Sequence, residues 1–486
     1  MTTFSFSMQT AQMLIDGELV EAASGARYDS LDPCTDKPLG SVPRASADDM
    51  NRAIEAAERA QPAWAALSVR ERGTFLRKLA AALMEHAQPL LEVEVQDTGN
   101  VISEMGTDIR RSAEALEYYA GLGLELKGHT IPATPGNIHM TIREPYGVVG
   151  KLVPFNHPLM FAAAKIAAPL IAGNTVVLKP SDQSPLSACY LGAMCKDVFP
   201  AGVVNIVTGL GAEAGDALVA HPRVKRLGFI GSATTGRMIQ RRAAEVAVKN
   251  ISLELGGKNP MIVFPDADLK KAARAAVAGM NFAWQGQSCG STSRLFLHDD
   301  IHDEVLTDIV SIVQGMKIGK PMDADAQVGP INNRPQYDKT QSYVAKALEE
   351  GARLECGGKR PDGFDPDGYW YEPTIFSGMT PDMTLAREEV FGPILSVFRW
   401  TDLEETIVHM NALDYGLTGA VWTSDLTTGL TVARRIESGV IWVNGVGAHY
   451  PGVPFGGKKN SGVGSEETYE DMLSYTEEKA INIILS

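Results

Sequence analysis

The feature that most restricts the fold is an alternation of residue types that begins near Gly147. Short runs of β-branched and other apolar residues alternate there with alanine-rich segments long enough to form helices. The apolar runs cover residues 148–153, 175–180, 203–209, 226–231, 251–255 and 261–264. Apolar strands separated by helices are typical of βαβ units, whose parallel sheet is buried on both faces. We therefore expect an α/β fold.

A second α/β segment is expected after residue 290. Its strands are predicted at residues 294–298, 352–358, 394–400, 419–424 and 439–445, with a long helix ending near Val313. Residues 46–120 follow a helical period instead. The hairpin at 128–147 and the apolar terminal stretch 473–486 are predicted to form a small third sheet between subunits, because an apolar terminal strand with open edges needs a partner.

Composition excludes several classes of partner. Forty-four lysines and arginines against 59 aspartates and glutamates give a formal net charge of −15. Such a surface repels phosphate backbones and anionic membranes, so neither nucleic acid nor membrane is expected as a partner. The longest apolar stretch, residues 161–173, is interrupted by Lys165 and is too short to span a bilayer. The amino terminus MTTFSFSMQT does not resemble a signal peptide, so a cytoplasmic location is expected.

The five cysteines are odd in number and form no CxxC pair, which fits a reducing compartment and predicts no metal site. One of them, Cys289, lies among small and polar residues in the loop FAWQGQSCGSTSR (282–294). A free cysteine usually behaves as a small buried hydrophobe. Glycine and serine neighbours instead favour a loop that brings an accessible, reactive thiol close to a ligand.

Two stretches of the first half suit a nucleotide. Gly231-Ser-Ala-Thr-Thr-Gly236 lies where a strand passes into a helix, and helix N-termini bind phosphate, although the spacing is not GxGxxG. In LKPSD (178–182), Lys179 and Asp182 follow a strand at the edge where open α/β sheets bind ligands. Both have a structural alternative. The glycines can serve packing alone, and Asp182 or Ser181 can cap the next helix.

Two further polar residues occupy unusual positions. Asn156 ends a strand in LVPFNHP (152–158), so its amide is expected to point across a crevice as a hydrogen-bond donor. Glu254 lies inside an apolar strand in ISLELGGKNP (251–260), where an unused carboxylate would be costly. The alternative for Glu254 is an outward-facing position on a strand whose leucines face the other side.

Seven motifs together resemble the aldehyde dehydrogenase superfamily, and the resemblance runs over nearly the whole chain. They are PFNHP, LKPSD, FIGSATTG, LELGGKNP, GQSCGSTSR, EEVFGPI and PFGGKKNSG. The resemblance implies a Rossmann-like NAD(P)-binding domain (1–123 and 146–255), a second α/β catalytic domain (256–457) and a small β oligomerisation arm (124–145 and 470–486). It also implies assembly as a homodimer or homotetramer.

Carried over to this chain, the resemblance makes Cys289 the nucleophile and Glu254 the general base. Asn156 and the Cys289 amide become the two donors of an oxyanion site. An aldehyde would be oxidised to an acid through a thiohemiacetal and a thioester hydrolysed by water. Because an ordinary thiol is only a few per cent ionised at neutral pH, help from amides, the nicotinamide cation or Glu254 is expected.

The cofactor contacts follow from the same resemblance. They are Pro154, Phe155, Lys179, Asp182, Gly211, Gly215, Phe229, Gly231, Ser232, Thr235, Gly236, Leu255, Glu389 and Phe391. Asp182 stands where NAD-preferring members usually carry glutamate, and the shorter acid leaves room for a 2′-phosphate. NAD is the expected cofactor, with NADP as the alternative. Phe155 replaces a tryptophan common in the family and should keep the wall apolar.

The implied substrate tunnel contains His157, Met160, Phe161, Ala164, Ser288, Gly290, His449, Tyr450 and Phe455. Its small residues should admit a bulky chain or an aromatic ring. None of these positions holds an arginine to clamp a carboxylate, and no cage for a quaternary ammonium is evident. We expect His157 to be a packed pocket residue without a catalytic role.

Two alternative functions remain at this point. A CoA-acylating semialdehyde dehydrogenase would pass the acyl group to CoA, but such members generally lack the base that Glu254 supplies. A non-catalytic binding or structural protein on the same fold would not need Asn156, Glu254, Cys289 and Glu389 together. Hydrolytic oxidation of an aldehyde with NAD(P) is therefore favoured, while the aldehyde itself stays open.

Overall fold

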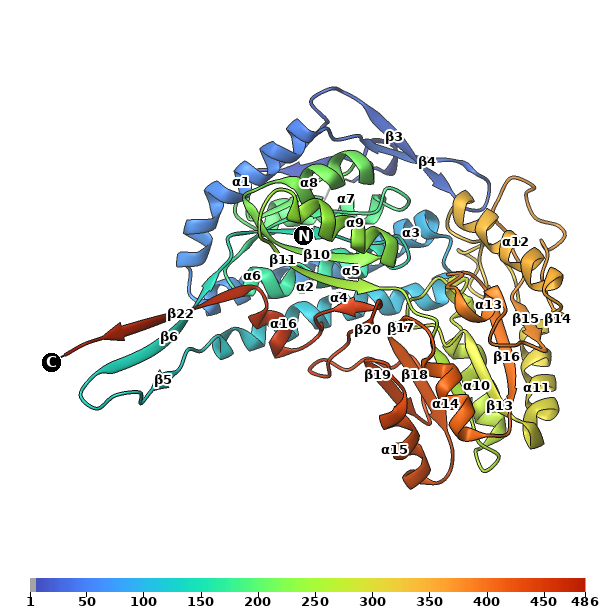
Figure 1. Ribbon diagram of the computed structural model, residues 1–486. Coiled ribbons are helices and arrows are strands. Elements are labelled where there is room, and N and C mark those ends of the chain that lie inside the picture. The colour runs from blue at the N-terminus through green and yellow to red at the C-terminus, as the bar shows by residue number, and fades with distance from the viewer. Residues whose placement is uncertain (1–5, 486) are drawn as a thin grey trace.

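The computed structural model describes residues 6–485 and contains two large sheets that account for the alternation in the sequence (Figure 1). The first has eight strands, and its middle five run parallel in the order β9-β8-β7-β10-β11. These are β7 (Val148–Leu152), β8 (Thr175–Lys179), β9 (Val204–Ile206), β10 (Val224–Gly231) and β11 (Asn250–Leu255). The predicted α/β fold is confirmed.

Successive residues of these strands enter hydrophobic cores on opposite faces of the sheet. Val149 and Val176 pack in the core that contains α2 and α4, whereas Val148 and Val177 pack in the core that contains α1 and α8. Side chains alternate along a strand, so a sheet covered on both faces needs apolar residues at every position. This requirement explains the continuous apolar runs in the sequence.

The helices around the first sheet come from two parts of the chain. The predicted helical region 46–120 forms α1 (Ala47–Ala66), α2 (Val69–Glu85), α3 (Ala87–Thr98) and α4 (Ile102–Leu122). Between the strands lie α5 (Pro158–Ala164), α6 (Ala167–Ile171), α7 (Leu186–Val198), α8 (Asp216–Ala220) and α9 (Ala233–Ala244). Within residues 6–485, no helix combines the length and the apolar character that crossing a bilayer requires.

The second sheet has seven strands in the order β14-β15-β16-β13-β12-β18-β19, all parallel except β14. They are β12 (Pro260–Val263), β13 (Arg294–His298), β14 (Arg353–Cys356), β15 (Thr374–Ser377), β16 (Ile394–Trp400), β18 (Thr418–Trp422) and β19 (Val440–Val443). Its helices are α10 (Leu269–Gly279), α11 (His302–Gln314), α12 (Arg334–Glu349), α13 (Thr384–Arg387), α14 (Leu403–Asn411) and α15 (Leu426–Arg435).

The predicted third sheet is present and projects from the body of the molecule (Figure 1). It pairs β22 (Thr476–Ile483) with β6 (Ile138–Pro145), and β6 with β5 (Thr130–Ile131), all antiparallel. Ile131, Ile138 and Ile483 are exposed on it. Residues 1–5 of the predicted NAD(P)-binding domain and Ser486 of the predicted arm lie outside the described residues.

Several strands were not predicted. Near the amino terminus, β1 (Met13–Ile15) and β2 (Glu18–Val20) extend the first sheet, and β3 (Arg27–Asp32) pairs with β4 (Lys37–Pro43). The short strand β21 (Gly462–Val463) lies beyond the second sheet in sequence but pairs with β11 of the first. Its Gly462 lies opposite Glu254, so the late segment covers the edge of the strand that carries this carboxylate.

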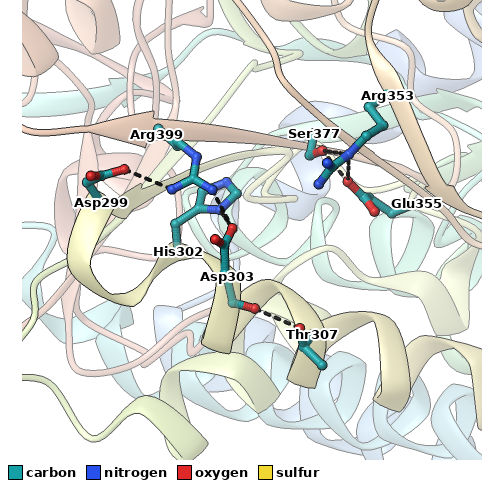
Figure 2. A network of polar contacts seen from close by, with 8 residues as sticks. All are labelled: Asp299, His302, Asp303, Thr307, Arg353, Glu355, Ser377 and Arg399. Atoms are coloured by element: carbon teal, nitrogen blue, oxygen red, sulfur yellow. Dashed lines mark hydrogen bonds and ion pairs between the residues drawn. The ribbon is translucent and has the colours of Figure 1, made fainter.

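A polar network fastens α11 and β14 to the outer part of the second sheet (Figure 2). Arg399 of β16 pairs with Asp299 at 2.8 Å and with Asp303 of α11. Arg353 of β14 pairs with Glu355 at 2.5 Å and donates to the Ser377 hydroxyl at 3.1 Å. The Arg399 and Asp303 side chains are 46% and 78% exposed, so water competes strongly for this contact.

Replacing Trp64 tests the core of the first sheet. Its ring is 1% exposed, packs against Phe75 and Phe199, and donates from Nε1 to the Leu170 carbonyl at 3.0 Å. We expect Trp64→Ala to lower the free energy of unfolding by about 3–5 kcal/mol, as measured by urea denaturation. Trp64→Phe should lose less free energy of unfolding, and Arg399→Ala should barely move the midpoint of urea denaturation. Equal midpoints for Trp64→Ala and Arg399→Ala would contradict this packing.

Candidate active site

Asn156 links the end of a strand of the first sheet to the loop that carries Cys289. It lies beyond the end of β7, is 4% exposed, and donates from Nδ2 to the Gln287 carbonyl at 2.8 Å. Its own carbonyl accepts from Asn100 Nδ2 at 3.0 Å. An amide nitrogen carries two protons, so the Gln287 bond orients the group and leaves one N–H for another acceptor. The Asn156 side chain thus reaches from the first sheet to the Cys289 loop.

Buried amide groups also restrain Gln287, whose carbonyl accepts from Asn156. The Asn332 amide N–H donates to Gln287 Oε1 at 3.2 Å, and Asn332 Nδ2 donates to Ser184 Oγ at 2.9 Å and to the Thr98 carbonyl at 3.2 Å. These residues come from four separate segments, and sequence analysis gave none of them a role. Because no local pattern marks a pairing between distant segments, only the fold reveals it.

Asn259 fixes the Cys289 loop from the other side. Its Nδ2 donates to the carbonyls of Cys289 at 2.7 Å and Ser291 at 2.9 Å, while its Oδ1 accepts from the Thr418 N–H at 3.0 Å. A single buried side chain therefore ties the loop to the start of β18. Asn259 is part of the motif LELGGKNP, yet sequence analysis gave it no role.

The surroundings of the Cys289 thiol favour its neutral form. Burial, followed by the nearby carboxylates of Glu254 and Glu389, raises the pKa of Cys289 to about 12, and the backbone amides of Gly290 and Cys289 oppose the shift. The expected help from amides is present. Glu254 does not help the thiol to ionise, because a negative charge beside the sulfur disfavours the thiolate.

Glu254 is buried near the end of β11, with an exposed fraction of 6%. Its neighbours Leu253 and Leu255 pack with Ala233 on the opposite face, so the strand alternates as expected. The outward-facing alternative is wrong because other segments cover this face. Neither carboxylate oxygen has a hydrogen-bond partner within residues 6–485. Burial, followed by the charge of Glu466, raises the pKa of Glu254 well above its ordinary value, and Lys165 opposes the shift.

Lys165 and Glu466 form a buried ion pair beside Glu254. Their side chains lie 2.6 Å apart and are 12% and 8% exposed. Burial lowers the pKa of Lys165, but Glu466 and Glu467 outweigh it and raise the pKa overall. Lys165 interrupts an apolar stretch of the sequence, and this was the available signal for a buried partner.

Glu389 and Phe391 lie next to the glycines that follow Glu254. Glu389 Oε1 accepts from the Gly257 N–H at 3.0 Å, and a Cβ at Gly256 would come within 1.9 Å of its Oε2. Burial raises the pKa of Glu389, and the Gly257 hydrogen bond opposes the shift. Phe391 has a left-handed backbone with φ of 59° and packs edge-on against Phe155 at 5.8 Å. Gly257, Glu389 and Phe391 line one cavity together with Ser288.

Lys179 and Asp182 lie at the carboxyl edge of the first sheet, as predicted. Burial lowers the pKa of Lys179, and the nearby Asp182 charge opposes the shift. The helix-cap alternative is wrong, because α7 begins at Leu186 and its first amide donates to Asp97 Oδ2 at 2.9 Å. Among residues 6–485, the Ser181 hydroxyl accepts a hydrogen bond only from the Gln183 amide, at 3.2 Å. Asp182 is therefore not used as a cap.

The glycine turn after β10 has both packing and capping features. Ser232 caps α9 by accepting from the Thr235 N–H at 3.2 Å. A Cβ at Gly236 would meet Leu255 at 2.9 Å, and one at Gly231 would meet the Phe229 ring at 2.4 Å. Steric need thus explains these two glycines. Gly211 and Gly215 bound a π-helical turn, and a Cβ at Gly211 would meet open space.

Four predicted tunnel residues share one face of α5 and the residue before it. His157, Met160, Phe161 and Ala164 are partly exposed, whereas Pro158, Leu159, Ala162 and Ala163 are buried. This three-and-four spacing places the first four along one open side of the helix. Ser288 and Gly290 flank Cys289 and are also partly exposed. His449 packs on Phe455 at 4.5 Å, while Tyr450 is 60% exposed.

Comparisons with known proteins agree with this arrangement. The profile of the aldehyde dehydrogenase family matches residues 19–481. Aldehyde dehydrogenase tropH of Talaromyces stipitatus is 44% identical, covering 97% of this chain and 93% of its own. Hydroxyisobutyraldehyde dehydrogenase of Mycolicibacterium austroafricanum is 38% identical, with coverages of 97% and 94%. The NAD+ complex of a Bacillus cereus aldehyde dehydrogenase superposes with a TM-score of 0.96 at 36% identity, over 98% of this chain and 97% of that one.

The family match covers nearly the whole length, and the chain belongs to the aldehyde dehydrogenase family.

Proposed function

We propose that this protein oxidises an aldehyde to the carboxylic acid with NAD(P) and water. Cys289 is the nucleophile, Glu254 the general base and Asn156 the side-chain donor to the oxyanion. The observation that carries the proposal is the hydrogen bond from Asn156 to Gln287, because it holds a side-chain amide beside the Cys289 loop with one N–H unused. The buried, unpaired carboxylate of Glu254 completes the set.

The residues present fit NAD(P). Lys179 and Asp182 lie at the strand edge where a ribose binds in such sheets, and the capped N-terminus of α9 suits the pyrophosphate. Glu389 faces a cavity beside Ser288 and would hold the nicotinamide ribose. The remaining proposed contacts are Pro154, Phe155, Gly211, Gly215, Phe229, Gly231, Thr235, Gly236, Leu255 and Phe391. NAD is preferred because Asp182 repels a 2′-phosphate, although its shorter side chain leaves NADP as the alternative.

The reaction balances as aldehyde, water and oxidised cofactor giving acid, reduced cofactor and a proton. The Cys289 thiol loses its proton to solvent as the sulfur bonds to the carbonyl carbon, and the oxygen becomes an alkoxide that Asn156 and the Cys289 N–H stabilise. Collapse of this alkoxide would expel hydride and leave a thioester on Cys289. NAD(P) held by Lys179, Asp182 and Glu389 would supply the hydride acceptor. Water then attacks the thioester carbon, and Glu254 takes its proton as the acid leaves and the thiol is restored.

The arrangement argues against the two other functions. Transfer of the acyl group to CoA needs no base for water, yet Glu254 is kept buried without a partner beside the Lys165–Glu466 pair. A structural protein would gain nothing from an unpaired buried carboxylate, which lowers stability. Acid release in the absence of CoA tests the proposal, and an absolute requirement for CoA would overturn it.

We also propose the domain division and assembly. Residues 1–123 and 146–255 form the NAD(P)-binding domain, 256–457 the catalytic domain, and 124–145 with 470–486 the oligomerisation arm. The exposed isoleucines of the third sheet support a partner subunit on the arm, in a homodimer or homotetramer. The acidic chain and its five free cysteines support a cytoplasmic location.

The substrate tunnel is proposed to run along α5 between the Cys289 flanks and His449. Its lining is His157, Met160, Phe161, Ala164, Ser288, Gly290, His449, Tyr450 and Phe455. Relatives of similar identity are named for different aldehydes, hydroxyisobutyraldehyde and retinaldehyde, so their names do not select one substrate for this chain.

The role of Glu254 can be tested by Glu254→Gln, which keeps the shape of the side chain but removes the base. With an aldehyde and NAD+, we expect one burst of NADH per active site, after which turnover stalls at the thioester. Stopped-flow absorbance would measure the burst, and intact-mass measurement would detect the thioester. Cys289→Ala, the control, should show neither burst nor adduct. Unchanged steady-state turnover in Glu254→Gln would refute the base role.

The raised pKa of Cys289 predicts how the free enzyme reacts with iodoacetamide. With a pKa of about 12, only about 1 in 10⁵ thiols is ionised at pH 7, since the thiolate forms above the pKa. Without cofactor, the alkylation rate of Cys289 should rise about tenfold per pH unit from pH 7 to 10, as followed by peptide mass spectrometry. A plateau near pH 8 would mean an ordinary thiol. Cys289→Ala identifies the peptide.

A further inference from the structure

His157 and Asp108 form a pair that sequence analysis did not predict. His157 directly follows Asn156, while Asp108 comes from α4, far from it in sequence. The His157 Nδ1 lies 2.6 Å from Asp108 Oδ2. The Asp108 side chain is 1% exposed, and that of His157 is 12% exposed. The carboxylate is therefore sealed in the interior, while the imidazole reaches from it toward the open side of α5.

Aromatic rings fix the remaining freedom of the imidazole. Phe161 meets it edge-on with centroids 5.9 Å apart, and Trp284 of the Cys289 loop lies at 5.6 Å. Trp284 is itself held by a 3.3 Å contact from Nε1 to the Met105 sulfur. The ring is thus clamped on three sides by Asp108 and two aromatic residues, and it stands next to both Asn156 and the Cys289 loop.

The other ring nitrogen, Nε2, has no protein partner. Within residues 6–485 no hydrogen bond to it is found, and it is not one of the buried unpaired atoms, so solvent or a ligand can reach it. His302 shows the opposite arrangement. There the ring lies in the interior with Nε2 buried, and its carboxylate partner Asp303 is 78% exposed. His157 instead keeps its carboxylate inside and presents a nitrogen outward.

We propose that His157 Nε2 hydrogen-bonds to a hydroxyl group of the aldehyde substrate, with Asp108 as the residue that positions the ring. The inference rests on the proposed function and narrows its substrate class to hydroxyaldehydes, aliphatic or phenolic. His157 is then a specificity-determining residue and takes no part in the bond changes at Cys289.

A hydroxyl is favoured over other polar groups by its chemistry. Because Asp108 accepts at Nδ1, that nitrogen carries a proton, and Nε2 is an acceptor in the neutral ring and a donor in the imidazolium. A hydroxyl can donate to the first form and accept from the second. A carboxylate can pair only with the second, and the buried Asp108 charge repels it. A hydrocarbon would cover Nε2 and leave it unpaired, which lowers affinity.

The test compares aldehydes that differ only in the hydroxyl. The 2-, 3- and 4-hydroxybenzaldehydes are measured against the fluorobenzaldehydes substituted at the same positions, and 3-hydroxypropanal against butanal. For at least one pair, we expect kcat/KM for the hydroxy compound to exceed that of its analogue by about tenfold or more. His157→Phe should bring this ratio close to one, and Asp108→Asn, which still offers an acceptor to Nδ1, should lower it only in part.

His449→Phe is the matched control, because it removes the other tunnel histidine, which pairs with Glu467 at 3.2 Å. The hydroxyl preference should survive in this variant. Three results would overturn the proposal: wild-type ratios near one in every pair, a ratio unchanged in His157→Phe, or a ratio lost in His449→Phe alone. If none of these aldehydes is oxidised, the proposed function is wrong, and this proposal is wrong with it.

Discussion

The hydrogen bond from Asn156 to the Gln287 carbonyl is the contact on which the site depends. One partner ends a strand of the first sheet, and the other lies two residues before Cys289, between strands of the second. The proposed chemistry needs a donor from one sheet within reach of a sulfur on a loop of the other. A preorganised donor in a water-poor setting stabilises an oxyanion by about 3 kcal/mol, but only if its position is held. Asn100 and Asn332 supply that restraint.

The charges around this contact help to raise the pKa values of Cys289 and Glu254, and both shifts disfavour ionisation of these groups. Burial and two carboxylates raise the pKa of Cys289, and burial with Glu466 raises that of Glu254. Both shifts therefore favour the neutral forms of the two groups. A bound positive charge would favour the thiolate, so ionisation of Cys289 is coupled to occupancy of the site.

The sequence predicted the parallel sheets because they rest on local patterns, and its short motifs indicated candidate site residues whose roles are proposals. Continuous apolar runs mark buried strands, and short motifs mark the loops at their ends. It did not predict β21, which has two residues and no apolar run, or the pairing of Lys165 with Glu466. These contacts join segments far apart in the chain, and their energetic reason appears only once burial is known. A lysine within the apolar stretch 161–173 was the one local hint.

His157 shows why substrate choice can vary while the chemistry stays fixed. The backbone at Asn156 is held by Asn100, and its side chain is held by Gln287, so neither restraint passes through residue 157. The side chain at 157 instead takes its orientation from Asp108 on α4. A substitution at 157 or 108 can therefore change which group faces the aldehyde chain while the oxyanion donor keeps both of its anchors. Adjacent residues serve different tasks here because their restraints come from different elements.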